Sequence, residues 1–162
     1  MPDRNGYSRT QITLHWLIAL LIFATWFTHE VMDDALEHRI ETGATGIDGN
    51  PVHVWLGGLA FALILVRIIV RHVSGAPGVL PETSPLMKLA AIWGHRLLYL
   101  LMVVVPALGA LTWYGGIEAT GEPHETLANL LMVVALGHAG AAIWHKYVLK
   151  DDTMQRMLKP RD

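Results

Sequence analysis

Three histidines lie inside or at the ends of one apolar stretch, residues 124–147, with the sequence HETLANLLMVVALGHAGAAIWHKY. The stretch is long enough to cross a bilayer as a helix, which takes about 20 residues. An imidazole in hydrocarbon is costly unless it is paired or bound. His124 and His138 are fourteen residues apart, nearly four helical turns, so they share a face and lie about 21 Å apart along the axis. One helix therefore offers a ligand near each membrane face, as two haems stacked across a bilayer would need.

The composition indicates a membrane protein. Hydrophobic residues make up 52% of the 162 residues and charged residues only 16%, whereas soluble domains carry about 25% charged residues. The chain has no cysteine, which excludes disulfide bonds, iron–sulfur clusters held by thiolates and covalently attached c-type haem. The net charge of −2 and the lack of a basic stripe outside the membrane edges argue against nucleic-acid binding.

We expect one membrane domain over residues 1–162, built as an all-α antiparallel bundle of four transmembrane helices with two haems between them. The apolar stretches predict spans at about 12–32, 52–72, 87–114 and 124–147. Residues 33–51 are acidic and rich in glycine and threonine, so we expect a loop there. The first apolar run lacks the layout of a signal peptide and is expected to remain as an uncleaved span.

The distribution of charge predicts the orientation of the bundle. With four spans, both termini and residues 73–86 lie on one side, and eleven of the twelve Lys and Arg residues fall there. Only Arg39 falls on the other side, so the positive-inside rule predicts cytoplasmic N- and C-termini. The opposite face is acidic and carries Glu30, Asp33, Asp34, Glu37, Glu41, Asp48, Glu118, Glu122 and Glu125.

This orientation sorts the histidines by depth. His53 and His124 both begin their spans at the outer face, so they can meet at one level. His15 and His138 lie at the inner level of the first and fourth spans. Two bis-histidine pairs result, and a b-type haem held by such a pair fits between the helices of a bundle.

Several residues have more than one interpretation. His145 is two turns after His138 on the same face and could replace it as the inner ligand. His95 could be a ligand, a donor to a quinone carbonyl or a partner of the backbone. Arg67 shares the face of His53 at the inner depth, where it could pair with a haem propionate or simply extend to the membrane surface. The remaining histidines are expected to be interfacial or solvated: His29, His38 and His72.

Four segments resemble the bacterial cytochrome b561 family of small four-helix, di-haem membrane proteins. They are YSRTQITLHW (7–16), HVWLGGLAFALILVRIIVR (53–71), GHRLLYLLMVVVPALG (94–109) and HETLANLLMVVALGHAGAAIWHKYVLKDDTMQRML (124–158). The resemblance implies that His15 and His138 ligate an inner haem b and that His53 and His124 ligate an outer one, which favours His138 over His145. It also implies a multi-pass protein of the bacterial inner membrane, with ubiquinone or menaquinone as a partner, because related cytochrome subunits of hydrogenases and formate dehydrogenases pass electrons between an outer partner and quinone.

Two axial imidazoles leave no open position on a haem iron, so the expected activity is outer-sphere electron transfer. We therefore predict a di-haem b-type cytochrome, an electron-transfer oxidoreductase linked to the quinone pool. A second candidate is a superoxide:ubiquinone oxidoreductase, the activity described for a small member of the family, although an acidic outer face does not attract an anion. A third is a cytochrome subunit docked to a dehydrogenase, and the least favoured is a transporter of metal ions or protons.

Overall fold

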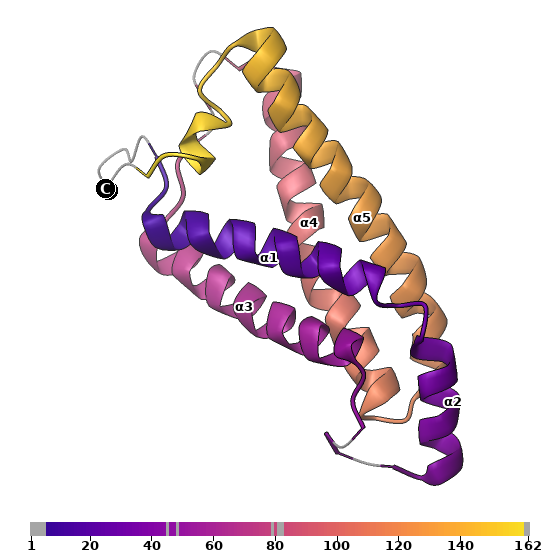
Figure 1. The fold of residues 1–162 in the computed structure, drawn as a ribbon. Coiled ribbons are helices and arrows are strands. Elements are labelled where there is room, and N and C mark those ends of the chain that lie inside the picture. The colour runs from indigo at the N-terminus through magenta and orange to yellow at the C-terminus, as the bar shows by residue number, and fades with distance from the viewer. Residues whose placement is uncertain (1–5, 45, 48, 79, 81–82, 161–162) are drawn as a thin grey trace.

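The computed structural model describes residues 6–44, 46–47, 49–78, 80 and 83–160, and within these ranges all regular elements are helical (Figure 1). Four helices are long and apolar enough to cross a membrane, counting the last together with the short turns at its two ends. They are α1 (Arg9–Phe27), α3 (Val52–Ser74), α4 (Pro85–Trp113) and α5 (Gly121–Trp144). Shorter elements are α2 (Met32–Thr42), the 3-10 turns η1 (Glu118–Thr120) and η3 (Gln155–Met157), and the π turn η2 (His145–Leu149). The predicted all-helical membrane bundle is confirmed.

The first helix begins earlier and ends earlier than its apolar stretch predicts. Ser8 caps α1 by accepting a hydrogen bond from the backbone N–H of Gln11 at 3.3 Å, and the Gln11 side chain accepts one from the Ser8 N–H at 3.1 Å. This capping box satisfies donors that a helix start leaves free, so the helix includes a polar first turn. Its last helical residue is Phe27 rather than a residue near 32, because the chain turns there and starts a second helix.

The expectation of a loop over residues 33–51 is wrong for its first part, where α2 forms. Asp33 and Asp34 lie in the first turn of α2 and Arg39 in the last, which suits the helix dipole. Gly43 ends α2 with φ 63°, a left-handed conformation that glycine adopts without strain. A short polar helix of this kind has no apolar run that would reveal it in the sequence.

The four long helices pack as two pairs. α1 lies along α3, with Leu14, Ile18 and Ile64 as a small core, and α4 lies along α5 around a second core that includes Leu101 and Leu131. α3 also contacts α4, whereas α1 and α5 approach each other only loosely. Most helix–helix packing is therefore within the two pairs. Contacts between α1 and α5 are made by long side chains.

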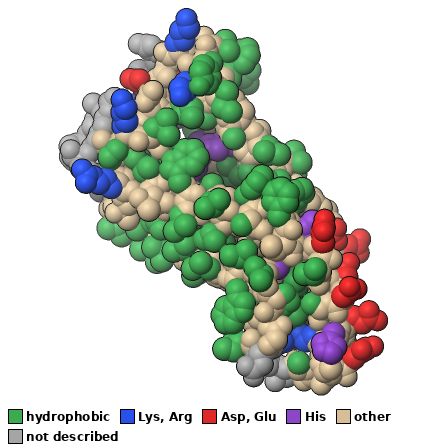
Figure 2. Space-filling view, in the orientation of Figure 1, with side chains coloured by type: hydrophobic (Ala, Val, Ile, Leu, Met, Phe, Trp, Pro, Cys, Tyr) green, Lys and Arg blue, Asp and Glu red, His purple; other side chains and the backbone are tan. Residues whose placement is uncertain are grey.

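The two ends of the bundle differ in charge. In Figure 2 the carboxylates gather at the end that carries α2, whereas Lys and Arg side chains gather at the end where the chain terminates. We call these the acidic end and the basic end. The acidic end comprises α2 and the first turns of α3 and α5, and the basic end comprises the start of α1, the end of α3 and the residues after α5.

Arg39 fastens α2 to the end of α4. Its side chain is only 8% exposed, its Nε donates to the carbonyl of Trp113 at 3.1 Å, and one terminal nitrogen donates to the carbonyl of Gly46 at 2.9 Å. The guanidinium also lies 4.6 Å from the centre of the Trp113 ring. Asn50 reinforces this attachment by accepting from Trp113 Nε1 at 2.8 Å and donating to the Tyr114 hydroxyl at 2.7 Å. The lone basic residue of the acidic end is thus a structural clamp.

We expect Arg39→Met to release α2 without unfolding the bundle. Hydrogen bonds from a charged donor contribute about 1.5–3 kcal/mol each, so amide hydrogen exchange in α2 should accelerate by about tenfold or more while exchange in α1 and α4 stays the same. Hydrogen-exchange mass spectrometry in detergent measures this. Glu41→Gln, an exposed change in the same helix, is the matched control, and unchanged exchange in Arg39→Met would contradict the clamp.

Candidate functional site

The acidic end brings together His53 and His124, as the sequence predicts. His53 lies in the first turn of α3 and His124 in the first turns of α5. Their ring centres are 6.1 Å apart and the ring planes are inclined at 83°. Two imidazoles bound to opposite sides of one metal ion, through bonds of about 2 Å and with each ring centre roughly 1.1 Å beyond its nitrogen, would have centres about 6.2 Å apart. The pair therefore has the separation that axial ligation requires.

Backbone carbonyls fix the orientation of both rings. His53 Nδ1 lies 3.0 Å from the carbonyl oxygen of Thr25, and His124 Nδ1 lies 2.8 Å from that of Val105. A carbonyl can only accept, so each Nδ1 carries the proton and each Nε2 keeps a free lone pair. This is the usual arrangement of histidines that bind metal, which donate their other N–H to a carbonyl or carboxylate. The Thr25 carbonyl lies in the last turn of α1, where it also accepts from the backbone N–H and the hydroxyl of Thr28 at 3.1 and 2.9 Å.

Gly109 makes room for the ring of His124. A Cβ atom at position 109 would lie 2.8 Å from Cε1 and 3.0 Å from Nδ1 of His124, closer than non-bonded atoms approach. Gly109 is four residues after Val105 on α4, so the missing side chain also leaves the Val105 carbonyl open to the imidazole. The hydrogen bond from His124 therefore depends on a glycine in the last turns of the apolar helix α4.

The basic end brings together three histidines from three helices. The ring centres of His15 on α1 and His138 on α5 are 6.3 Å apart, inclined at 77°, which again matches the separation for axial ligation. His95 on α4 lies 5.0 Å from His138, centre to centre, and its Nδ1 lies 2.6 Å from the carbonyl oxygen of Ala91. In each histidine pair, one ring comes from α5 and the other from α1 or α3. Each histidine pair therefore links the α4–α5 helices to the α1–α3 helices. Figure 2 shows a histidine at the bottom of a hollow in the apolar surface.

His145, the alternative inner ligand, has a different partner. Its Nδ1 lies 2.5 Å from Oδ2 of Asp151 and 3.4 Å from the hydroxyl of Thr153. Burial alone would raise the pKa of Asp151, but the hydrogen bonds from His145 and Thr153 outweigh it and hold the pKa below its usual value. His145 and Asp151 thus form a polar pair at the point where α5 ends.

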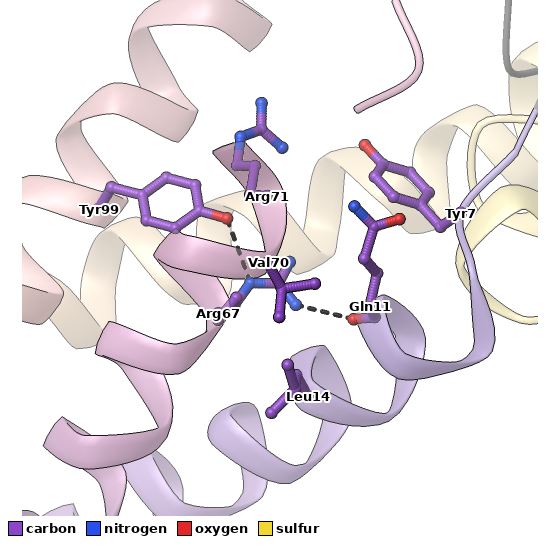
Figure 3. A pocket seen from close by; sticks show the side chains of 7 residues that line it. All are labelled: Tyr7, Gln11, Leu14, Arg67, Val70, Arg71 and Tyr99. Carbon is purple, nitrogen blue, oxygen red and sulfur yellow. Dashed lines mark hydrogen bonds between the residues drawn. The ribbon is translucent and has the colours of Figure 1, made fainter. Parts of the chain in front are cut away.

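Arg67 points inward at the basic end rather than out to the membrane surface (Figure 3). Its Nε donates to the Tyr99 hydroxyl at 3.2 Å and a terminal nitrogen donates to the carbonyl of Gln11 at 2.9 Å. Arg71, one turn later, lies 5.5 Å from the centre of the Tyr99 ring. A small pocket here is lined by Tyr7, Gln11, Leu14, Arg67, Val70, Arg71 and Tyr99. Two guanidinium groups and two phenols suit a carboxylate or another anion.

The two imidazole pairs suit a metal ion that a cofactor already coordinates. Within the described residues, no group of three or more His, Asp or Glu side chains is arranged to hold a metal ion. Each pair of imidazoles would supply two ligands to a metal ion, so the remaining ligands would have to come from a cofactor such as a porphyrin.

Two tryptophans connect α1 to the rest of the bundle across this space. Trp26 Nε1 donates to Oδ1 of Asn129 on α5 at 3.1 Å, and Trp16 Nε1 donates to the carbonyl of Met157 after α5 at 2.9 Å. Asn129, Gly109 and the two carbonyls are features that histidine spacing could not reveal. The only signal in the sequence is a glycine or a polar amide inside an apolar run. Such a residue indicates that another group packs closely there, but it does not identify that group.

Comparison with known proteins identifies the family of the chain. Residues 6–160 match the family model described as prokaryotic cytochrome b561. Cytochrome b562 of Cereibacter sphaeroides is 42% identical, over 99% of this chain and all of that protein. Cytochrome b561 homolog 1 of Escherichia coli is 30% identical, over 97% of this chain and 99% of that one. A protein of Yersinia pestis named probable superoxide oxidase CybB is 29% identical, over 94% and 95%.

We expect Gly109→Ala to destabilise the protein, although Gly→Ala inside a helix normally stabilises by about 0.5–1 kcal/mol. The new methyl group must displace the His124 ring and break its bond to Val105, and overpacking of this kind costs about 1–3 kcal/mol. The midpoint of thermal unfolding in detergent should therefore fall. Gly94→Ala, in the same helix where a Cβ meets nothing within 4 Å, is the control.

A double-mutant cycle isolates the contact between Gly109 and His124. If the ring is the obstacle, adding Gly109→Ala to His124→Ala should cost little or nothing, because the imidazole is already gone. An equal loss of stability in both backgrounds would show that position 109 acts through some other neighbour.

Proposed function

Because the chain belongs to the prokaryotic cytochrome b561 family, we propose that it is a di-haem b-type cytochrome of the bacterial inner membrane that exchanges electrons with the quinone pool. The observation that carries this proposal is the presence of two imidazole pairs, with ring centres 6.1 and 6.3 Å apart, that share α5. Residues 1–162 would then form a single membrane domain whose function is electron transfer.

In this proposal His53 and His124 hold one haem b at the acidic end, and His15 and His138 hold the other at the basic end. A haem bound in this way supplies one-electron redox chemistry. The four histidines would hold the haems through their Nε2 atoms, which would leave no position on either iron open to a substrate. Along α5, the fourteen residues between His124 and His138 span about 21 Å, which spaces two redox centres across the apolar layer.

Arg67 is proposed as the partner of a haem propionate at the basic end. Two of its nitrogens are held by Tyr99 and Gln11, which fixes the guanidinium in the pocket and leaves its remaining N–H groups for a carboxylate. His95 is proposed as a contact of the quinone. Its Nδ1–H is donated to the carbonyl of Ala91, so the ring offers Nε2 as an acceptor for a quinol hydroxyl. Its ring is exposed on the apolar surface beside His138, where a quinone dissolved in the lipid could reach it.

A superoxide:ubiquinone oxidoreductase is the second candidate, because one relative is named as a probable superoxide oxidase. The structure of the acidic end disfavours it. Arg39, the one basic residue there, is buried and bonded to two carbonyls, so carboxylates dominate the field that an approaching anion would meet. The same field would steer a basic protein partner toward this end, which suits the third candidate, a cytochrome subunit docked to a dehydrogenase.

We expect the purified protein to contain two low-spin b haems, seen in a reduced-minus-oxidised spectrum and counted as pyridine haemochrome. His53→Ala and His124→Ala should each remove the same haem, and His15→Ala and His138→Ala should each remove the other, because one missing axial ligand leaves the site incomplete. The count per chain should fall from two to one in each variant.

His38→Ala is the control for this experiment, since His38 is exposed on α2 and should leave both haems in place. Protein without haem, expressed with adequate haem supply, would refute the cytochrome proposal. Two haems in His138→Ala, with loss of one in His145→Ala, would move the inner ligand to His145.

We also propose that both termini are cytoplasmic and that the acidic end faces outward, as the positive-inside rule requires. The chain has no cysteine, so a single introduced cysteine is the only target for a thiol reagent. In intact cells, a membrane-impermeant maleimide should label Glu41→Cys and not Lys159→Cys, both at exposed positions. Permeabilised cells should show labelling of both variants, and the reverse pattern in intact cells would invert the topology.

A further inference from the structure

His145 and Asp151 form a closely built pair with no role in the proposed axial ligation. The His145 Nδ1 donates to Oδ2 of Asp151 at 2.5 Å, while the other carboxylate oxygen accepts from the backbone N–H of Thr153 at 2.9 Å. The backbone N–H of Asp151 in turn donates to the carbonyl of His145 at 3.2 Å. The pair is locked by three hydrogen bonds, and the carboxylate is held in its ionised form because its pKa lies below the usual value.

The geometry of the pair leaves one side of the imidazole free. Nδ1–H is committed to the carboxylate, so Nε2 is the atom that can accept and release a proton. The carboxylate holds the ring in this orientation and so fixes Nε2 as the atom that faces away from Asp151. The same arrangement orients the base in many sites of general acid–base catalysis.

The pair lies between the apolar layer and water at the basic end. His145 is seven residues after His138, two turns, so it lies on the same face of α5 about 10 Å farther along. The side chains of His145 and Asp151 are 17% and 26% exposed, which is enough for exchange with water. The segment after α5 folds back over this region, because Met157 accepts from Trp16 on α1 and Arg156 donates to the carbonyl of Gly78.

The other charged groups nearby do not compete for this role. Lys146 and Lys150 adjoin the pair in sequence, and the Lys146 ammonium lies 5.1 Å from the centre of the Tyr147 ring. Asp152 follows Asp151, and Arg156 is bonded to Gly78. The turn contains no second histidine, so His145 supplies its one imidazole, the side chain that most often acts in general acid–base catalysis.

We propose that His145 and Asp151 form the proton-transfer site that connects a quinone bound near the basic-end histidines with water. This inference rests on the proposed quinone link. Oxidation of one quinol to quinone breaks two O–H bonds and releases two electrons, which the two haems would accept one each, and two protons, which would pass in turn through Nε2 of His145 to water. Reduction of quinone follows the reverse course, with protons taken from water through the same atom.

The test is the rate at which decylubiquinol reduces the purified protein carrying both haems, followed by stopped-flow absorbance. His145→Asn keeps an N–H near the position of Nδ1, so it preserves the bond to Asp151 but removes Nε2. We expect quinol-driven reduction to slow by about tenfold or more, with a larger solvent deuterium isotope effect. Added imidazole should restore part of the rate, and dithionite should reduce the variant and the wild type alike.

Asp151→Asn is the second variant and should slow the reaction by a smaller factor, because the base remains but loses its carboxylate. His72→Asn is the matched control: His72 is an exposed histidine at the end of α3 whose Nδ1 bonds the carbonyl of Ile68. It should leave the rate unchanged.

Three outcomes would overturn the proton-transfer role: a wild-type rate in His145→Asn, a slow rate that imidazole does not raise and deuterium does not affect, or loss of a haem from His145→Asn. The second would show a purely structural lock and the third a ligand. If decylubiquinol and a menaquinol analogue both fail to reduce the wild type, the quinone link itself fails, and this inference fails with it.

Discussion

The acidic-end site depends on two hydrogen bonds between an imidazole N–H and a backbone carbonyl. In hydrocarbon, a polar group without a partner costs several kcal/mol, so His53 and His124 need acceptors as well as a ligand. The structure supplies them from places where carbonyls are accessible, the last turn of α1 and the stretch of α4 that Gly109 uncovers. These bonds select the tautomer with a free Nε2, and they turn the two rings toward each other.

The packing of the helices follows from the same requirement. If all four helices closed tightly around one core, no space would remain for a flat macrocycle between the rings. Instead, α1 with α3 and α4 with α5 form two tight pairs, each with its own small group of buried residues, and only Ile22 and Met102 are common neighbours of both groups. The histidine pairs link one helix pair to the other. Trp26 and Asn129 hold α1 and α5 at a fixed separation near the acidic end. The packing of the bundle therefore joins the two helix pairs but leaves the histidine side chains between them.

Much of this arrangement follows from the sequence, because its main signals are periodic. Hydrophobic length predicts the four spans, and the fourteen-residue interval between His124 and His138 predicts a shared face and opposite depths. The sequence did not predict features that depend on contacts between residues far apart in the chain or on irregular backbone. The polar helix α2 and the burial of Arg39 depend on Trp113, far away in the chain, and no periodicity links them. The partner of His145 likewise depends on a π turn and on Lys150 with φ 56°, a backbone reversal that a helical pattern does not encode.

The two histidine pairs differ in how firmly the protein holds them, and this difference bears on where a quinone would react. At the acidic end both rings are fixed by carbonyls of other helices. At the basic end, within the described part of the chain, the ring nitrogens of His15 and His138 have no hydrogen-bond partner, and His95 bonds only within its own helix. The His145–Asp151 pair proposed for proton transfer also lies at the basic end. A carrier of two electrons and two protons needs polar groups that can rearrange and a path for protons to water. The basic end offers both. The acidic end offers a rigid site beneath a layer of carboxylates. Electron exchange with a protein partner requires only such a rigid site, since no proton moves, so the two ends are suited to two different kinds of partner.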